Sequence, residues 1–79
     1  MPYVKPEVRE ELDKGSPPDN PGELNYVITK ICIEYSKYLP TYQVYNDIIG
    51  ALECCKFEMY RRRIANYEDS KILTNGDVY

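Results

Sequence analysis

Apolar residues recur at helical spacing in two stretches of the chain. Between residues 21 and 39 they fall three or four positions apart and form one stripe, at Leu24, Val27, Ile28, Ile31, Tyr35 and Leu39. Between residues 41 and 75 a second stripe alternates steps of three and four, at Tyr45, Ile48, Leu52, Cys55 and Met59, with a neighbouring line at Ile49, Tyr60, Ile64 and Tyr67. Such spacing puts apolar side chains on one face of an amphipathic helix. The pattern predicts helices and no strand.

Capping residues and prolines set the expected ends of these helices. Asn20 takes the N-cap position, Pro21 is the first helical residue and Glu23 falls at the third, which matches a capping box. Pro40 cannot continue a helix, and the residue before a proline is pushed out of the helical region. Gly76 suits the position that follows the last helical turn. One helix is therefore expected to end just before Pro40 and the next at about residue 75.

These boundaries predict a single helical domain over residues 1–79, divided into a short N-terminal helix with a proline-rich connector (1–20), a second helix (21–39), a long third helix (41–75) and a tail (76–79). The third helix would be about 50 Å long at 1.5 Å per residue. A short second helix cannot cover that length, so the third helix either breaks near Asn66 or is covered by another subunit. We expect an all-α helical hairpin with a short N-terminal helix and one long C-terminal helix, assembling as a homo-oligomer.

Composition also favours an oligomer, because a domain this small buries only about 60% of its unfolded surface and is marginal as a monomer. The three cysteines (Cys32, Cys54 and Cys55) are an odd number and lie in apolar stretches, which favours buried thiols over disulfides. The sequence contains no histidine and no Cys-x-x-Cys pair, so we expect no metal site and no cofactor.

The sequence also lacks the usual signs of catalysis. Histidine, the common acid or base near neutral pH, is absent, and no phosphate-binding glycine loop or nucleophile elbow is present. We expect no catalytic residue and a protein that is not an enzyme. The net charge of −3 disfavours nucleic acid as a partner. A polar, proline-broken start and the lack of a long apolar run predict no signal peptide, no membrane span and a cytoplasmic location.

The leading candidate for ligand binding is a set of aromatic, basic and acidic residues in one stretch, at Tyr60, Arg61, Arg62, Tyr67, Glu68 and Asp69. Arginine can grip a phosphate with two hydrogen bonds. The two tyrosines lie seven positions apart on one helix face and could stack on a base. The carboxylates could accept hydrogen bonds from ribose hydroxyls or base amines. In the alternative interpretation the arginines pair with carboxylates across a subunit interface and the tyrosines pack in a core.

A second candidate is the polar side of the helix at 21–39, with Asn25, Tyr26 and Thr29. Asn25 and Thr29 are one turn apart and face together. The alternative is an ordinary polar surface. Four further tyrosines surround the turn between the two long helices and would cap the end of the hairpin or form an interface, at Tyr35, Tyr38, Tyr42 and Tyr45.

Three stretches resemble a family of small uncharacterised proteins encoded by tailed phages, prophages and related mobile elements. They are NPGELNYVIT at residues 20–29, YNDIIGALEC at 45–54, and the sequence from YRR through YED to NGDVY at 60–79. The resemblance covers most of the chain after residue 20, whereas residues 1–20 match poorly and are expected to vary. Members of the family typically have a small or apolar residue where this chain has Arg63, which places Arg63 outside the predicted site.

The resemblance implies a phage origin, and with it an analogy to phage "sponge" proteins, which are small, helical and oligomeric. Those proteins sequester nucleotide-derived immune signals of the host. The hypothesis is that this chain binds such a signalling molecule in the host cytoplasm without turnover. The alternative is an inhibitor or adaptor that binds a host defence protein through the tyrosine-rich surface.

Overall fold

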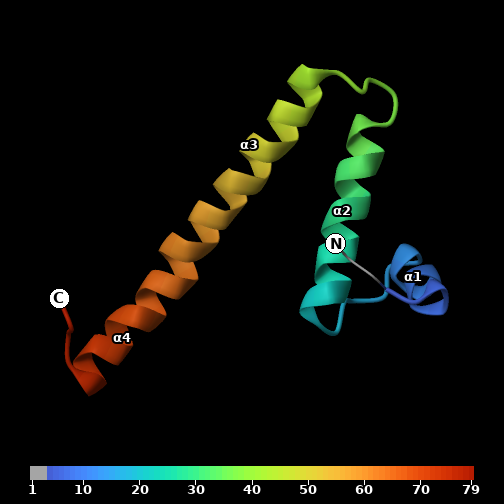
Figure 1. Cartoon of the computed structure of the whole chain (residues 1–79). Coiled ribbons are helices and arrows are strands. Elements are labelled where there is room, and N and C mark those ends of the chain that lie inside the picture. Colours follow the sequence, from blue (N-terminus) through green and yellow to red (C-terminus); the bar gives the residue numbers. More distant parts are fainter. Residues whose placement is uncertain (1–3) are drawn as a thin grey trace. The chain divides into compact units, whose positions relative to one another are not determined.

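A computed structural model describes residues 4–79, and residues 1–3 of the predicted polar start lie outside the described residues. The element order is α1 (Pro6–Asp13), α2 (Pro21–Ser36), α3 (Tyr42–Met59), the π-helical turn η1 (Tyr60–Ile64) and α4 (Ala65–Asn75) (Figure 1). No strand occurs in this part of the chain, so the all-α prediction is confirmed for it. Among residues 4–79, no helix combines the length and the apolar character needed to cross a lipid bilayer.

The chain divides into two units, one ending at Val44 and the other beginning at Tyr45, and each is described by itself. In the first unit α1 packs against α2 (Figure 1). Leu12 of α1 is the one apolar residue of the described chain that is buried, at 7% exposure. The Tyr26 hydroxyl of α2 donates a hydrogen bond to Asp13 Oδ1 at 2.9 Å. The burial of Leu12 and the hydrogen bond from Tyr26 to Asp13 therefore stabilise the contact between α1 and α2.

The capping box at the start of α2 forms in a modified way. The Glu23 N–H donates to Asn20 Oδ1 at 2.9 Å, as the sequence predicts. The Glu23 carboxylate accepts from the Asn20 side-chain amide at 2.9 Å and from the Asp19 N–H at 3.1 Å. The side chain of Glu23 thus reaches the backbone one residue earlier than in a standard capping box.

The C-terminal end of α2 lies at Ser36, three residues before the predicted end at Leu39. The Lys37 N–H already bonds three residues back, to the Glu34 carbonyl at 3.3 Å, and the Thr41 N–H bonds to the Leu39 carbonyl at 2.8 Å. Pro40 keeps Leu39 out of the helix, because a residue before proline is driven out of the helical region.

The segments α3, η1 and α4 follow one another without a gap and form one long helix, which begins at Tyr42, just before the second unit (Figure 1). The three segments contain 18, 5 and 11 residues, which gives about 50 Å. Thr41 Oγ1 accepts from the Val44 N–H near its start. Gly76 ends it with a φ of 85°, and the Gly76 N–H bonds to the Ile72 carbonyl at 2.9 Å.

The long helix has no core within its own unit. From Tyr45 to the C-terminus, every residue except Ile48 and Ala65 is exposed. The exposed residues include large apolar side chains such as Met59, Ile64 and Tyr67. The pairing of α2 with this helix, which the predicted hairpin requires, stays a prediction.

Candidate functional site

The Tyr-Arg-Arg-Arg-Ile segment of the leading candidate site forms the π-helical turn. The Ala65 N–H bonds to the Tyr60 carbonyl, five residues back, whereas an α-helix bonds four residues back. The Asn66 side-chain amide donates to the Arg62 carbonyl of this turn at 2.9 Å. The π-turn therefore inserts one extra residue into an otherwise α-helical rod. Single π-turns of this kind are frequent at functional sites.

The extra residue changes which side chains meet across the turn. The Tyr60 hydroxyl donates to Glu68 Oε1 at 2.6 Å, eight residues along the chain. In a plain α-helix two residues eight positions apart point about 80° apart, whereas seven positions make almost two full turns. The inserted residue gives Tyr60 and Glu68 the geometry of a seven-residue spacing. The sequence predicts Tyr60 and Tyr67 on one face, but the π-turn brings Tyr60 to Glu68 instead.

The Tyr60–Glu68 bond alters the acidity of the phenol. The hydrogen bond to the Glu68 carboxylate raises the pKa of Tyr60 above its ordinary value of 10.0, and the negative charge of Glu68 and partial desolvation raise the pKa further. Ionisation would put two negative charges side by side. The bond to Glu68 therefore keeps Tyr60 in its neutral, hydrogen-bond-donating form to higher pH than an unpaired tyrosine.

Arg61 and Arg62 converge on a single carboxylate oxygen. Arg61 Nη2 lies 2.9 Å from Glu58 Oε1, and Arg62 Nε lies 2.5 Å from the same oxygen. Within residues 4–79, Arg63 forms no ion pair. The sequence-based prediction did not include Glu58, although its spacing of three and four residues from Arg61 and Arg62 is the standard signal for helical ion pairs.

The surroundings of these ion pairs are partly apolar. An open hollow of about 310 Å³ is lined by Cys55, Glu58, Met59, Arg62 and Arg63. The Nζ atom of Lys71 lies 5.5 Å from the centre of the Tyr67 ring, a distance at which a cation is attracted to an aromatic face. Of the six predicted residues, Tyr60 and Glu68 are paired directly, and Arg61 and Arg62 are joined through Glu58. Tyr67 contacts Lys71, and Asp69 joins none of these contacts.

The second candidate group lies on α2, in the first unit. The Thr29 hydroxyl donates to Asn25 Oδ1 at 3.0 Å. Tyr26 instead bonds to Asp13 of α1. Desolvation beside α1 raises the pKa of Tyr26, and the hydrogen bond to Asp13 and the charge of that carboxylate raise it further. Tyr26 thus belongs to the α1–α2 contact, and only Asn25 and Thr29 form a polar pair. Residues 4–79 contain no cluster of three or more metal-ligating side chains.

One protein-family model matches residues 1–78, and its description is a domain of unknown function, DUF6899. The chain belongs to the DUF6899 family. The match extends through residues 1–20, so the N-terminal helix and connector are part of this DUF6899 domain. No curated protein and no solved structure matches the chain.

The Tyr60–Glu68 pair predicts a pH dependence. Because folding raises the Tyr60 pKa, this bond contributes stability that is fully present below pH 10 and is lost as the pH rises through the folded-state pKa. We expect Glu68→Gln to lower the Tyr60 pKa towards 10, since it removes the charge. Phenolate absorbance during alkaline titration measures this, with Tyr60→Phe subtracted in each background to isolate one tyrosine among nine. An unchanged Tyr60 pKa in Glu68→Gln would contradict the assignment.

Proposed function

We propose that this DUF6899 protein binds an anionic, nucleotide-derived signalling molecule and sequesters it without turnover. The observation that carries the proposal is the convergence of Arg61 and Arg62 on one oxygen of Glu58. Two guanidinium groups that reach one carboxylate oxygen can also reach one phosphate oxygen. The Glu58 carboxylate thus takes the place that we assign to a ligand phosphate.

A ligand phosphate can displace the Glu58 carboxylate from Arg61 and Arg62 at a small cost in free energy. The side chains of Glu58, Arg61 and Arg62 are 50%, 68% and 68% exposed. Exposed ion pairs of this kind contribute only about 0.2–1 kcal/mol each. Each phosphate of a cyclic nucleotide or of ADP-ribose carries one negative charge and two free oxygens, as a carboxylate does, so it can take the place of Glu58 against both arginines. Glu58 then holds the two guanidinium groups together until the ligand arrives.

The remaining residues of the segment suit the rest of a nucleotide. Tyr60, hydrogen-bonded to Glu68, offers an aromatic ring for stacking on a base, and Tyr67 offers a second ring. Asp69, beside Glu68, can accept hydrogen bonds from ribose hydroxyls or base amines. Sequestration needs tight binding and no reaction, which agrees with a sequence that contains no histidine. We assign this role to a homo-oligomer of a phage-encoded protein in the host cytoplasm.

A second candidate function is inhibition of a host protein by direct binding. It is supported by Tyr35, Tyr38 and Tyr42, which are 66%, 87% and 80% exposed in the first unit. Exposed tyrosines are typical of protein interfaces. A pull-down of host proteins with the Tyr35/Tyr38/Tyr42 triple alanine variant tests it. Capture of the same partners by the variant and the wild type would exclude this surface.

The nucleotide proposal predicts effects of opposite sign for neighbouring residues. We expect Arg61→Gln or Arg62→Gln to weaken binding by about 10- to 100-fold, since each removes charge-assisted hydrogen bonds to the phosphate. Glu58→Gln should strengthen binding, because the ligand no longer displaces a carboxylate. Arg63→Gln is the matched control, with the same loss of charge and little expected effect. Calorimetry against cyclic nucleotides and ADP-ribose derivatives measures all four variants.

Two results would contradict the proposal. One is the absence of binding to every member of the nucleotide panel by the wild-type protein. The other is an equal loss of affinity in Arg61→Gln, Arg62→Gln and Arg63→Gln, together with weaker binding by Glu58→Gln. That second pattern would indicate general charge attraction and not a site built on two converging arginines.

A further inference from the structure

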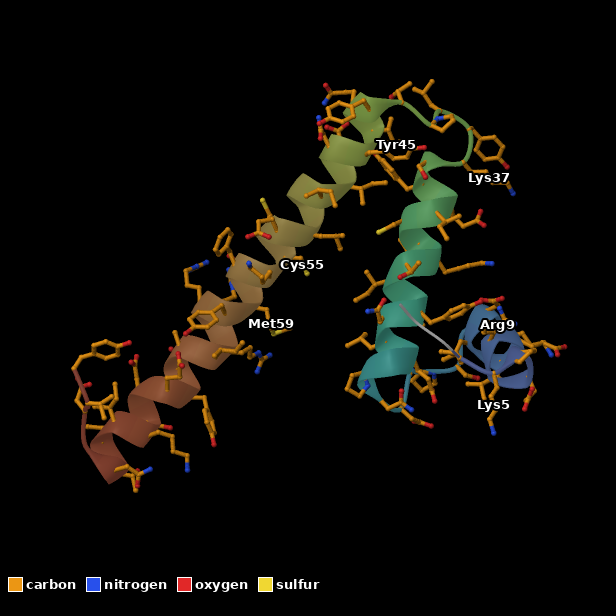
Figure 2. The ribbon with its side chains drawn as sticks, in the orientation of Figure 1. Lys5, Arg9, Lys37, Tyr45, Cys55 and Met59 are labelled. Atoms are coloured by element: carbon orange, nitrogen blue, oxygen red, sulfur yellow. The ribbon has the colours of Figure 1, made fainter. Side chains whose placement is uncertain are left out.

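The apolar stripe of the long helix continues through the π-turn only because that turn contains an extra residue. We call this stripe the seam, and it consists of Tyr45, Ile48, Leu52, Cys55, Met59, Ile64 and Tyr67. Its steps are three or four residues except for the step of five from Met59 to Ile64, which spans the π-turn. The labelled side chains of Tyr45, Cys55 and Met59 project to the same side of the helix (Figure 2).

Helix geometry shows the effect of the insertion. In a plain α-helix, at about 100° per residue, Ile64 would lie roughly 140° around the axis from Met59. With one extra residue in the turn, the same step behaves as a step of four and leaves Ile64 about 40° away. Without it, the line of Met59 would continue through polar residues, at Arg63, Asn66 and Ser70. The π-turn thus replaces a polar continuation with Ile64 and Tyr67.

The C-terminal half of this apolar face is uncovered. Met59, Ile64 and Tyr67 are 55%, 41% and 63% exposed. The longest other helix, α2, has 16 residues and spans about 24 Å. Even if the whole of α2, about 24 Å, packed along the long helix, about half of the roughly 50 Å length of the long helix would stay uncovered. α2 is therefore too short to cover the whole of the long helix, which leaves room on it for another chain.

The exposed face of the long helix is extensive. Over residues 45–79 only Ile48 and Ala65 are not exposed. A standard interface needs roughly 800 Å² from each partner, and a face that runs through most of this unit is the kind of surface that can provide it.

We propose that a second copy of this chain packs its seam against the same seam here, over Met59 to Tyr67. A two-fold interface needs only one surface that complements itself. This surface can meet the requirement, because Met59, Ile64 and Tyr67 form one exposed apolar line and the carboxylate beside it, Glu58, is already paired with Arg62 of the same chain. The inference rests on the homo-oligomeric state proposed above but not on the nucleotide.

The interface would also complete the candidate site. The hollow beside Arg62 is lined by two seam residues, Cys55 and Met59, together with Glu58 and two arginines. A second copy on the seam adds a wall to this open hollow and supplies a second set of arginines close by. Removing water from one side strengthens charge-assisted bonds to a bound phosphate.

Sedimentation of the ligand-free protein tests the interface with a matched pair of variants. Wild type should be a dimer or larger, and Ile64→Asp should weaken association by at least about 100-fold, because the oligomer would bury an unpaired charge. Leu73→Asp is the control, since Leu73 is 90% exposed and lies about half a turn from the seam. A monomeric wild type would overturn both the oligomer and the seam. Equal association of wild type and Ile64→Asp would overturn the seam alone.

A second pair of variants tests the π-turn while leaving every seam residue in place. Deleting Arg63 removes the extra residue, and a plain α-helix then keeps Ile64 and Tyr67 in line, so association should persist. Inserting one alanine after Arg63 turns the seam by about 100° beyond the π-turn and should abolish association. Circular dichroism confirms that both remain helical. Loss of association in the deletion with retention in the insertion would overturn the proposal, whatever the outcome with nucleotides.

Discussion

A long helix with no packing partner in its own unit is the constraint on which the rest of this structure depends. Isolated helices are marginal in water, and most helical stability in proteins comes from packing an apolar face. Here α3, η1 and α4 present such a face over most of their length, yet within this unit every residue except Ile48 and Ala65 is exposed. The first unit has a single buried side chain, Leu12, to hold α1 on α2. The homo-oligomer proposed above would supply the packing that neither unit contains by itself.

One inserted residue connects this packing requirement to the candidate chemistry. The π-turn keeps Ile64 and Tyr67 in line with Met59, and it also brings the Tyr60 hydroxyl to Glu68. On the same stretch, Arg61 and Arg62 meet at Glu58. The seam and the charged groups occupy adjacent faces of one helix. A ligand site at this place would be sensitive to association, because the hollow beside Arg62 shares its lining with the seam.

The sequence predicts the ends of the helices well, because local chemistry sets them. Asn20 and Glu23 form the cap, and Gly76 takes the positive φ that ends the long helix. The pairing of Tyr26 with Asp13 depends on how α1 docks on α2, which no local pattern encodes. The π-turn has no residue signature of its own. Its one signal is the five-residue step from Met59 to Ile64. In an α-helix with 3.6 residues per turn, that step would place Ile64 on a different face from Met59. For that reason the sequence-based prediction grouped Tyr60 with Tyr67. Glu58 was left out of that prediction although its spacing from Arg61 and Arg62 is a local signal.

The most direct test of the account compares two neighbouring thiols. Cys55 lies on the seam, whereas Cys54 lies about 100° away around the helix, and both are free and exposed in the single chain. Variants that retain only one of them, with the other two cysteines changed to serine, can be treated with a small thiol reagent. The account predicts that Cys55 reacts at least about tenfold more slowly than Cys54 where the oligomer dominates, and that dilution removes the difference. Equal rates at all protein concentrations would contradict it.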